Sequence, residues 1–363
     1  MKVLHIINNL MAGGAEKLIV DTLPIYNEKG ITADLLVFTQ NNSAFLEALK
    51  DQNCCKIHNL NVISIYDPRI VFKLKKYLKN VDIVHVHLFP SFYYVALCKR
   101  IFSITSKLIY TEHSTTNRRM NNWFFKRMDL YVYSLYDKIV CISDTVETVI
   151  KSYYKLQKSQ IEVIPNGINL ESIYNSQPLD LASVDLLFQS EQKYIIQVSR
   201  FIYPKDHKTL IKSLCHLPPH IKLILVGTGV LLEKCQIQVS KLKLQDRVIF
   251  LGFRGDVPSL LKSCDIIVLS TFYEGLSLSS MEALACGKPF IGTNVPGLKE
   301  VIQNAGLLFE VGDSPALATH ILKLLSDSSY YQQIASQCLL KSQNYSIEKM
   351  VLNHIKLYEA QVS

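Results

Sequence analysis

Several features that mark other classes of protein are missing from this chain of 363 residues. No stretch reaches the roughly 18 consecutive apolar residues that a membrane-spanning helix requires. There is also no low-complexity tract and no long run of charge, so disorder is excluded as a main theme. The N-terminal residues MKVLHIINNL are typical of a first strand rather than of a signal peptide. We therefore expect a folded cytoplasmic protein.

Cysteine patterns and common nucleotide-binding motifs are missing too. The nine cysteines are odd in number, Cys54 and Cys55 are adjacent, and no Cys-x-x-Cys occurs. This pattern indicates neither a disulfide framework nor a zinc site, and it favours buried free thiols. No Gly-x-Gly-x-x-Gly follows the first apolar run and no Walker A pattern is present, which argues against dinucleotide binding and ATPase activity.

Charge is distributed unevenly along the chain. The net charge is +8, yet residues 69–127 alone hold twelve Lys or Arg against two acids, Asp82 and Glu112. The same segment contains the only tryptophan, in the run Trp123-Phe124-Phe125. Cations interleaved with aromatic residues fit an anionic membrane interface, but they equally fit an amphipathic helix whose apolar face is core. Nucleic acid is a weaker alternative, because no nucleic-acid-binding module is visible.

The pattern of apolar runs predicts an α/β fold made of two domains. Short β-branched runs alternate with helical stretches, and this alternation starts again after an irregular polar stretch at 175–192. The expected strands are Lys2–Ile7, Ala33–Thr39, Asp82–His87, Lys107–Glu112, Lys138–Ile142 and Ile161–Ile164, then Tyr194–Val198, Lys222–Val226, Val248–Leu251, Ile266–Leu269 and Pro289–Ile291. We expect one domain at 1–175, a second at 193–340, and a C-terminal helix at 341–363 that packs toward the first. Ligands of such sheets bind at the carboxyl ends of the strands, here in a cleft between the domains.

The segment 270–297 has the features of a phosphate-binding strand–loop–helix unit. A strand is followed by the loop Glu274-Gly275-Leu276-Ser277-Leu278 and then by a helix, whose first N–H groups and dipole favour an anion. Carboxylates accept hydrogen bonds from hydroxyls, so Glu274 and Glu282 on either side of a phosphate suit a sugar nucleotide. Glu282 has a competing interpretation, because Ser279-x-x-Glu282 also fits a capping box with Ser279 as the N-cap.

This segment resembles the donor-binding signature of the retaining glycosyltransferases of family 4, which have the two-domain GT-B fold. The resemblance rests on Glu274-Gly275, Glu282 and Ala285-Cys286-Gly287-Lys288-Pro289. Further matches follow in the family's order: Gly13-Gly14-Ala15-Glu16, Pro165-Asn166-Gly167-Ile168, Val198-Ser199-Arg200, Pro204-Lys205, Val226-Gly227-Thr228-Gly229 and Phe250-Leu251-Gly252. The ordered set covers nearly the whole chain. It implies two Rossmann-like, doubly wound domains that face a central cleft.

The resemblance also implies roles for individual residues. Arg200 and Lys205 would hold the diphosphate, where two cations stabilise the charge that develops on the leaving group. His113, which follows the expected strand Lys107–Glu112, would contact the donor sugar and its phosphate. Catalytic roles are expected for His113, Arg200, Lys205 and Glu274, and donor binding for Gly13, Gly14, Gly227, Gly275, Leu276, Ser277, Leu278 and Glu282. For His85 and His87 we favour a structural role, because alternation places both on one face of the sheet.

The implied activity is transfer of a sugar from a nucleotide donor, UDP-hexose or UDP-N-acetylhexosamine, to a hydroxyl of a glycan or lipid-diphosphate-linked acceptor with retention of configuration. Surface polysaccharide assembly is the expected pathway. No Asp-x-Asp occurs, so neither a metal nor a cofactor is expected. We expect the basic segment 69–127 to contact the anionic inner face of the cytoplasmic membrane, and no nucleic acid to bind. Two alternatives stay open: a nucleotide-sugar epimerase on the same fold, and a non-catalytic nucleotide-sugar-binding protein.

Overall fold

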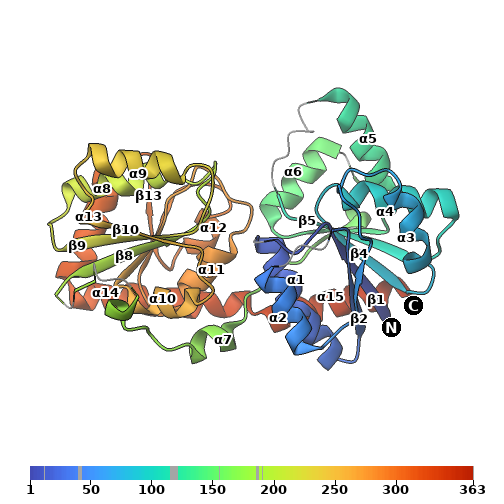
Figure 1. The fold of residues 1–363 in the computed structure, drawn as a ribbon, viewed down its shortest axis with the longest axis horizontal. Coiled ribbons are helices and arrows are strands. Elements are labelled where there is room, and N and C mark those ends of the chain that lie inside the picture. The colour runs from blue at the N-terminus through green and yellow to red at the C-terminus, as the bar shows by residue number, and fades with distance from the viewer. Residues whose placement is uncertain are drawn as a thin grey trace. The chain divides into compact units, whose positions relative to one another are not determined.

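The chain folds into two compact units. A computed structural model describes residues 1–362 apart from 12, 40–42, 115–121, 155, 185–187 and 190. The first unit combines Met1–Ile168 with Ile347–Ser363, and the second is Asn169–Ser346. Each unit is a fully parallel sheet with helices on both faces (Figure 1).

The first unit is built on a sheet of seven strands in the order β3-β2-β1-β4-β5-β6-β7. Its strands are β1 (Lys2–Ile7), β2 (Thr32–Val37), β3 (Ile57–Asn59), β4 (Ile83–His87), β5 (Lys107–Glu112), β6 (Lys138–Cys141) and β7 (Ile161–Val163). Most of β1, β4 and β5 is buried on both faces, and their sequences are accordingly rich in Val, Ile and Leu, although buried histidines interrupt β1 and β4. From β1 the chain adds strands first toward one edge of the sheet and then, from β4 onward, toward the other edge, as in a Rossmann fold.

Helices cover this sheet on both sides (Figure 1). They are α1 (Gly14–Glu28), α2 (Ala44–Gln52), α3 (Ile70–Leu78), α4 (Ser91–Phe102), α5 (Trp123–Ser134), α6 (Asp144–Tyr154) and α15 (Ile347–Val362). On one face α15 packs beside α1. On the other face Phe92 of α4 stacks with Tyr110 of β5 and Tyr136, with ring centroids 4.3 and 5.1 Å apart.

The second unit has six parallel strands in the order β10-β9-β8-β11-β12-β13. The strands are β8 (Lys193–Val198), β9 (Ile221–Val226), β10 (Val248–Gly252), β11 (Ile266–Leu269), β12 (Phe290–Thr293) and β13 (Leu307–Phe309). The helices are α7 (Leu170–Asn175), α8 (His207–Ser213), α9 (Leu232–Lys241), α10 (Val257–Ser263), α11 (Leu278–Ala285), α12 (Lys299–Ile302), α13 (Ser314–Ser326) and α14 (Ser328–Ser342). This is the Rossmann order 3-2-1-4-5-6, and it reverses between β8 and β11.

The observed boundaries differ from the expected ones at the junctions. The helix α7 belongs to the second unit, although we expected the first domain to continue to residue 175. It packs on α11, and the ammonium of Lys262 donates to the carbonyl of Tyr174 at 2.9 Å. The expected start of the C-terminal helix at 341 lies inside α14, and α15 begins at Ile347. The short strands β3 and β13 were not expected, whereas β7, which also has three residues, lies within the expected strand Ile161–Ile164.

Two further expectations concern cysteines and membrane spans. All nine cysteines are free; six are buried, Cys54 and Cys55 are half-buried and Cys215 is exposed. In the part of the chain that the structure describes, no helix has both the length and the apolar character to cross a membrane.

Candidate active site

The predicted diphosphate-binding residues lie at the carboxyl edge of the second sheet, at its topological switch point. Arg200 and Lys205 are in the loop that follows β8, and Glu274 is in the loop that follows β11. These two strands are neighbours in the sheet, and the chain leaves them toward opposite faces. The crevice that such a reversal leaves outside the strand ends is where open α/β sheets bind their ligands.

The structure joins two of these residues directly. The ammonium of Lys205 forms a hydrogen-bonded ion pair with Oε1 of Glu274, and the side chains are only 15% and 11% exposed. The loops that hold them are tied together by backbone hydrogen bonds, from Asp206 N to Ser270 O at 3.0 Å and from Phe272 N to Pro204 O at 2.9 Å. The site therefore holds a shielded cation and a shielded carboxylate in fixed contact.

Arg200 differs from Lys205 in its surroundings. Its side chain is exposed, and the structure records no ion pair for it with any described residue. A guanidinium in this position has its planar donor set open to a phosphate, which it binds in a bidentate manner.

Two glycines allow the loops of this edge to approach one another. Gly227 has φ of +138°, and a Cβ there would lie 2.2 Å from the carbonyl oxygen of Ser199. Gly297 has φ of +82°, and its Cβ would lie 2.2 Å from the carbonyl oxygen of Glu274. Close contact between backbones thus requires glycine at position 227, and its donor-binding role stays a prediction.

The helix α11 begins where the phosphate-binding interpretation requires, but the capping-box interpretation is wrong. The N-cap is Ser277, whose side chain accepts no cap hydrogen bond and instead meets Oγ of Ser279 at 2.9 Å. Ser279 is inside the helix, so Glu282 is at the fifth helical position rather than the third. Glu282 is 7% exposed. The first N–H groups of α11, which follow the loop of Gly275 and Leu276, have no intrahelical partner and favour an anion.

A buried polar network beneath the loops escaped the sequence analysis. Gln197 in β8 accepts from Ser270 N at 2.8 Å and donates to Oγ of Ser199 at 2.9 Å. That hydroxyl lies 3.1 Å from Nε2 of His207, whose ring stacks on Phe201 with centroids 4.1 Å apart. Burial, and then the charge of Lys205, lower the pKa of His207 to about 4. A glutamine in the middle of an apolar strand was the available signal.

In the first unit, the predicted glycines form the start of α1. Gly13 is its N-cap in extended conformation, and Gly14 is its first residue. As an N-cap, Gly13 has no side chain with which to cap this helix, and a Cβ there would lie 2.2 Å from the carboxylate of Glu16. The loop after β1 therefore leaves helix N–H groups at the carboxyl edge of the first sheet, beside the β1–β4 switch point.

His113 lies at the same edge. It is two residues beyond Thr111, the last residue of β5 that pairs with β4. Its Nε2 is 3.2 Å from Nδ1 of His87, and burial lowers the pKa of His113 to about 4. The neighbouring Glu112 is buried on the other face, where it accepts from the hydroxyl of Tyr133 at 2.8 Å. Alternation along β4 does place His85 and His87 on one face, with ring centroids 4.4 Å apart.

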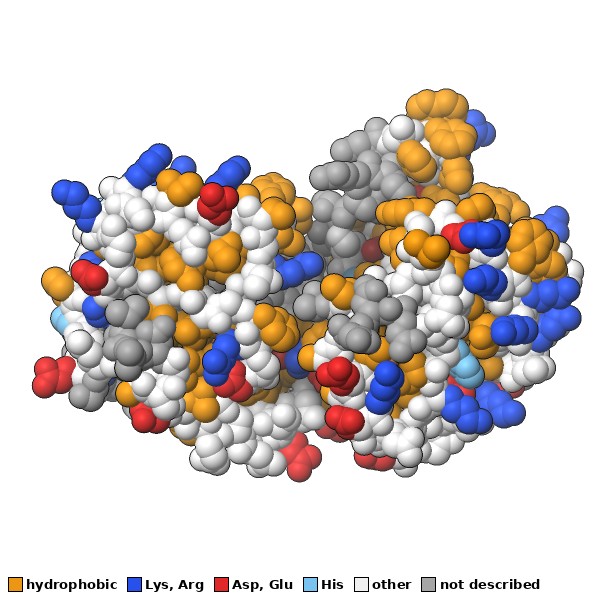
Figure 2. Space-filling view, viewed as in Figure 1, with side chains coloured by type: hydrophobic (Ala, Val, Ile, Leu, Met, Phe, Trp, Pro, Cys, Tyr) orange, Lys and Arg blue, Asp and Glu red, His pale blue; other side chains and the backbone are white. Residues whose placement is uncertain are grey.

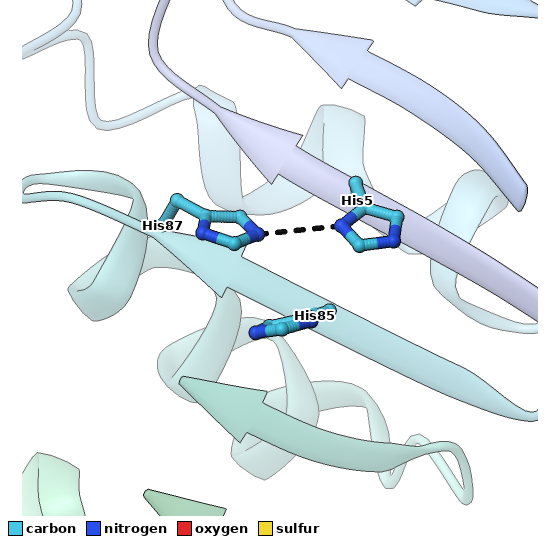
Figure 3. A group of neighbouring side chains, drawn as sticks. All are labelled: His5, His85 and His87. Carbon is cyan, nitrogen blue, oxygen red and sulfur yellow. Dashed lines mark hydrogen bonds between the residues drawn. The ribbon is translucent and has the colours of Figure 1, made fainter. Parts of the chain in front are cut away.

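Three of these buried histidines, His5, His85 and His87, have ring nitrogens within 4.8 Å of one another (Figure 3). Nδ1 of His5 faces Nε2 of His87 at 3.3 Å. Both nitrogens of His85 are engaged elsewhere, Nδ1 with the hydroxyl of Tyr358 at 2.5 Å and Nε2 with that of Thr111 at 2.6 Å. The donor set therefore suits a hydrogen-bonded network better than a metal ion.

The basic segment forms parts of α3, α4 and α5. Arg118 and Arg119 lie outside the described residues, and so does the loop that contains them. The first two turns of α5 are exposed on every side from Asn122 to Met128, with Trp123 71% and Phe124 54% exposed. Figure 2 shows hydrophobic side chains gathered over α5 with a cation at the margin. The interpretation of Trp123-Phe124-Phe125 as core is therefore wrong.

A Rossmann-type parallel sheet that occurs twice in one chain is the architecture of the GT-B fold. Two family models agree with this class. Residues 12–172 match the model described as Glycosyltransferase Family 4, and residues 181–338 match that described as Glycosyl transferases group 1. The chain belongs to this family of group 1, family 4 glycosyltransferases.

Individual relatives and structures are similar over most of their length. The N-acetyl-alpha-D-glucosaminyl L-malate synthase of Bacillus anthracis is 28% identical over 81% of this chain and 79% of its own. The N-acetylgalactosamine-N,N'-diacetylbacillosaminyl-diphospho-undecaprenol 4-alpha-N-acetylgalactosaminyltransferase of Campylobacter jejuni is 24% identical over 96% and 97%. The crystal structure of Anabaena HepE in complex with UDP and glucose superposes with a TM-score of 0.87 at 22% identity, over 99% of this chain and 100% of that one.

Proposed function

We propose that this glycosyltransferase moves a sugar from a UDP-sugar to a hydroxyl of a glycan or lipid-diphosphate-linked acceptor, with retention of anomeric configuration. The observation that carries the proposal is the Lys205–Glu274 pair at the switch point of the second sheet, with the exposed guanidinium of Arg200 in the same loop as Lys205. The cations suit a diphosphate, and the carboxylate suits sugar hydroxyls. The two relatives are named as a synthase and a transferase, and the name of the second gives a diphospho-undecaprenol-linked sugar as its acceptor.

The proposed chemistry needs no enzyme nucleophile. The acceptor oxygen attacks the anomeric carbon on the face from which the diphosphate departs, and the bond from that carbon to the phosphate oxygen breaks. The acceptor's proton passes to the departing phosphate. Arg200 and Lys205 stabilise the negative charge that grows on the diphosphate, and they act most strongly when that charge is complete. His113 and Glu274 hold the sugar, and Glu282 holds the ribose diol.

A donor screen tests this function. The full chain is incubated with each of several UDP-sugars and a synthetic lipid-diphosphate-linked glycan, and the product is identified by mass spectrometry and by the NMR coupling of its anomeric proton. We expect a product with the donor's anomeric configuration. An inverted product, or a glycosyl-enzyme intermediate trapped on the protein, contradicts the retaining step. Incubation with UDP-sugar alone tests the epimerase alternative, which requires an epimer without acceptor. Binding of donor without hydrolysis or transfer supports the non-catalytic alternative.

We also propose that transfer is independent of metal, because cationic side chains take the place that a divalent ion has on a diphosphate. Treatment with a chelator followed by desalting is expected to leave most of the activity. Complete loss that Mg²⁺ or Mn²⁺ restores contradicts this part of the proposal.

The acceptor suggests a partner for the exposed tip of α5. We propose that residues 122–131 of α5 contact an anionic membrane, with Trp123 and Phe124 at the lipid interface and Lys126 and Arg127 facing the headgroups. The first half of α5 is exposed, whereas buried polar contacts fix the second half of this helix to the rest of the unit. Asp129 accepts from the hydroxyl of Tyr154 at 2.8 Å and also from that of Tyr93.

Trp123 reports on this contact directly, because it is the only tryptophan in the chain. Its emission is expected to shift to the blue with phosphatidylglycerol vesicles, less so as salt rises, and not with phosphatidylcholine vesicles. Phe124→Ser is expected to weaken vesicle association about tenfold, whereas Leu340→Ser, which alters a 68% exposed residue of α14, leaves it unchanged. Unchanged emission in protein that sediments with vesicles places the contact elsewhere, and equal binding to both lipids contradicts the electrostatic part.

A further inference from the structure

Three imidazoles form a continuous hydrogen-bonded line from the core of the first unit to its carboxyl edge. Nδ1 of His5 is 3.3 Å from Nε2 of His87, and Nδ1 of His87 is 3.2 Å from Nε2 of His113. Figure 3 shows the first of these contacts, between β1 and β4. The line ends at the histidine that we place against the donor.

The line follows from the strand register. His5 of β1 is paired with His85 of β4, so His87 lies two residues nearer the carboxyl edge on the same face. His87 is paired with Thr111 of β5, and His113 lies two residues beyond Thr111. Each histidine thus reaches its neighbour diagonally across adjacent strands, over a distance that an imidazole ring spans.

The imidazoles in this line are neutral at physiological pH. Burial lowers the pKa of His5 to about 3 and that of His113 to about 4, and burial with the adjacent His113 lowers the pKa of His87 well below its ordinary value. A neutral imidazole has one N–H donor and one acceptor nitrogen. A chain of such rings therefore has a single direction of donation, from one end to the other.

The buried end of the chain selects that direction. Nε2 of His5 is buried and has no hydrogen-bond partner among the residues that the structure describes. If donation ran inward from His113, His5 would hold its proton on Nε2, as a buried N–H without an acceptor. If donation runs outward, Nε2 of His5 has only an unpaired lone pair. Buried N–H groups without an acceptor are rarer in proteins than buried acceptors without a donor, which favours outward donation. Outward donation puts the proton of His5 on Nδ1 and that of His87 on Nδ1.

We propose that His87, backed by His5, is a positioning residue that fixes the tautomer of His113, so that His113 accepts at Nε2 and presents an Nδ1–H donor to the sugar or phosphate of the donor. This inference rests on the proposed function, in which His113 contacts the donor. The role resembles that of a group which holds a catalytic imidazole in one tautomer, with a neutral ring in place of a carboxylate. His87 acts through His113 and touches no substrate.

The tautomer is measured without any substrate. The full chain is labelled with ¹⁵N-histidine, and long-range ¹H–¹⁵N spectra report which nitrogen of each ring is protonated; His113→Ala identifies the signals of His113. We expect protonated Nδ1 and unprotonated Nε2 for His113 in the wild-type protein. A protonated Nε2 overturns the proposal, whatever the activity of the variants.

Variants of His87 separate positioning from packing. His87→Asn keeps an amide donor near the place of Nδ1, whereas His87→Leu removes it. We expect His87→Leu to release His113 toward the Nε2–H form and to lower kcat/KM about tenfold, the loss of one hydrogen bond, with both effects restored by His87→Asn. His85→Asn is the matched control, because His85 is equally buried on the same strand but bonds to Tyr358 and Thr111.

The outcomes also separate this inference from the proposed function. An unchanged His113 tautomer in folded His87→Leu overturns the positioning role. A changed tautomer with wild-type kcat/KM leaves the tautomer assignment standing, and instead removes His113 from the donor site. If His87→Leu does not fold, the wild-type spectrum alone decides the direction of donation.

Discussion

Glu274→Gln is the most informative single change in the second unit, because it acts in opposite directions on two ligands. In the free protein the carboxylate of Glu274 forms an ion pair with the ammonium of Lys205, and both side chains are largely shielded from water. A diphosphate that binds to this ammonium must compete with the carboxylate. The amide of glutamine keeps the shape of the side chain but gives up the charge, so it releases Lys205 for the phosphate.

The magnitude follows from the burial of the pair. Exposed ion pairs contribute about 0.2–1 kcal/mol, and breaking a fully buried pair costs about 3–5 kcal/mol. With exposures of 15% and 11% the Lys205–Glu274 pair lies between these limits. We take about 1–2 kcal/mol. Removing this competition is expected to tighten UDP binding by about 5- to 30-fold.

Transfer responds the other way, because Glu274 also holds hydroxyls of the sugar in the proposed function. We expect kcat/KM for transfer from the UDP-sugar to fall. The Kd for UDP, measured by calorimetry on the same preparation, should also fall, because UDP binds more tightly. Glu147→Gln is the matched control; it breaks a Glu–Lys pair in α6 of the first unit, with exposures of 24% and 33%. Unchanged or weaker UDP binding in Glu274→Gln refutes the idea that the carboxylate competes with the diphosphate.

Three further predictions address other parts of the molecule. Arg200→Ala and Lys205→Ala are each expected to lower kcat/KM by roughly 10²-fold, as for loss of one contact to transition-state charge; wild-type kinetics in either variant removes that residue from the site. Glu282→Gln is expected to weaken donor binding with little change in melting temperature, and less so for a 2′,3′-dideoxy donor; an unchanged donor Kd excludes Glu282 from the ribose site. The pKa values of His5 and His113 are lowered in the folded state, so the unfolded chain takes up protons first as pH falls. The free energy of unfolding should therefore fall below pH 6.5, by about 1.4 kcal/mol per pH unit for each histidine, and equal denaturation midpoints at pH 7.5 and 5.5 contradict this.

Much of the fold was readable from the sequence because the buried parallel strands are apolar runs with sharp ends. The predicted Lys107–Glu112 coincides with β5, and Ile266–Leu269 with β11. The edge strand β3 was missed because only one of its three residues, Ile57, is apolar. The boundary at Ile168 was missed because the irregular polar stretch expected as the junction lies at 175–192, and only the contacts of α7 with α11 assign this helix to the second unit.

The candidate site shows a similar division between local and long-range information. The family resemblance singled out Lys205 and Glu274 separately, but their contact depends on two loops meeting at the switch point, which no local pattern encodes. The histidine line is similar. Alternation along one strand placed His85 with His87, whereas the contacts with His5 and His113 require the strand order β1-β4-β5. The capping-box error was local, because the helix begins two residues earlier than Ser279 would allow.

The first unit is made of two segments that the ribosome synthesises far apart in time. Its C-terminal helix α15 provides Tyr358, which bonds to Nδ1 of His85, and His354, which bonds to the hydroxyl of Tyr26 at 2.8 Å. The amide of Ile347 donates to the carbonyl of Ile168 at 3.0 Å, so the whole second unit is inserted at one point of the first. Every residue of the inserted unit is therefore translated before the first unit has its last helix. Because domains generally fold as units during synthesis, N-terminal first, the first unit of this chain differs in one respect: the buried imidazole of His85 and hydroxyl of Tyr26 gain their α15 partners only after the second unit has been translated.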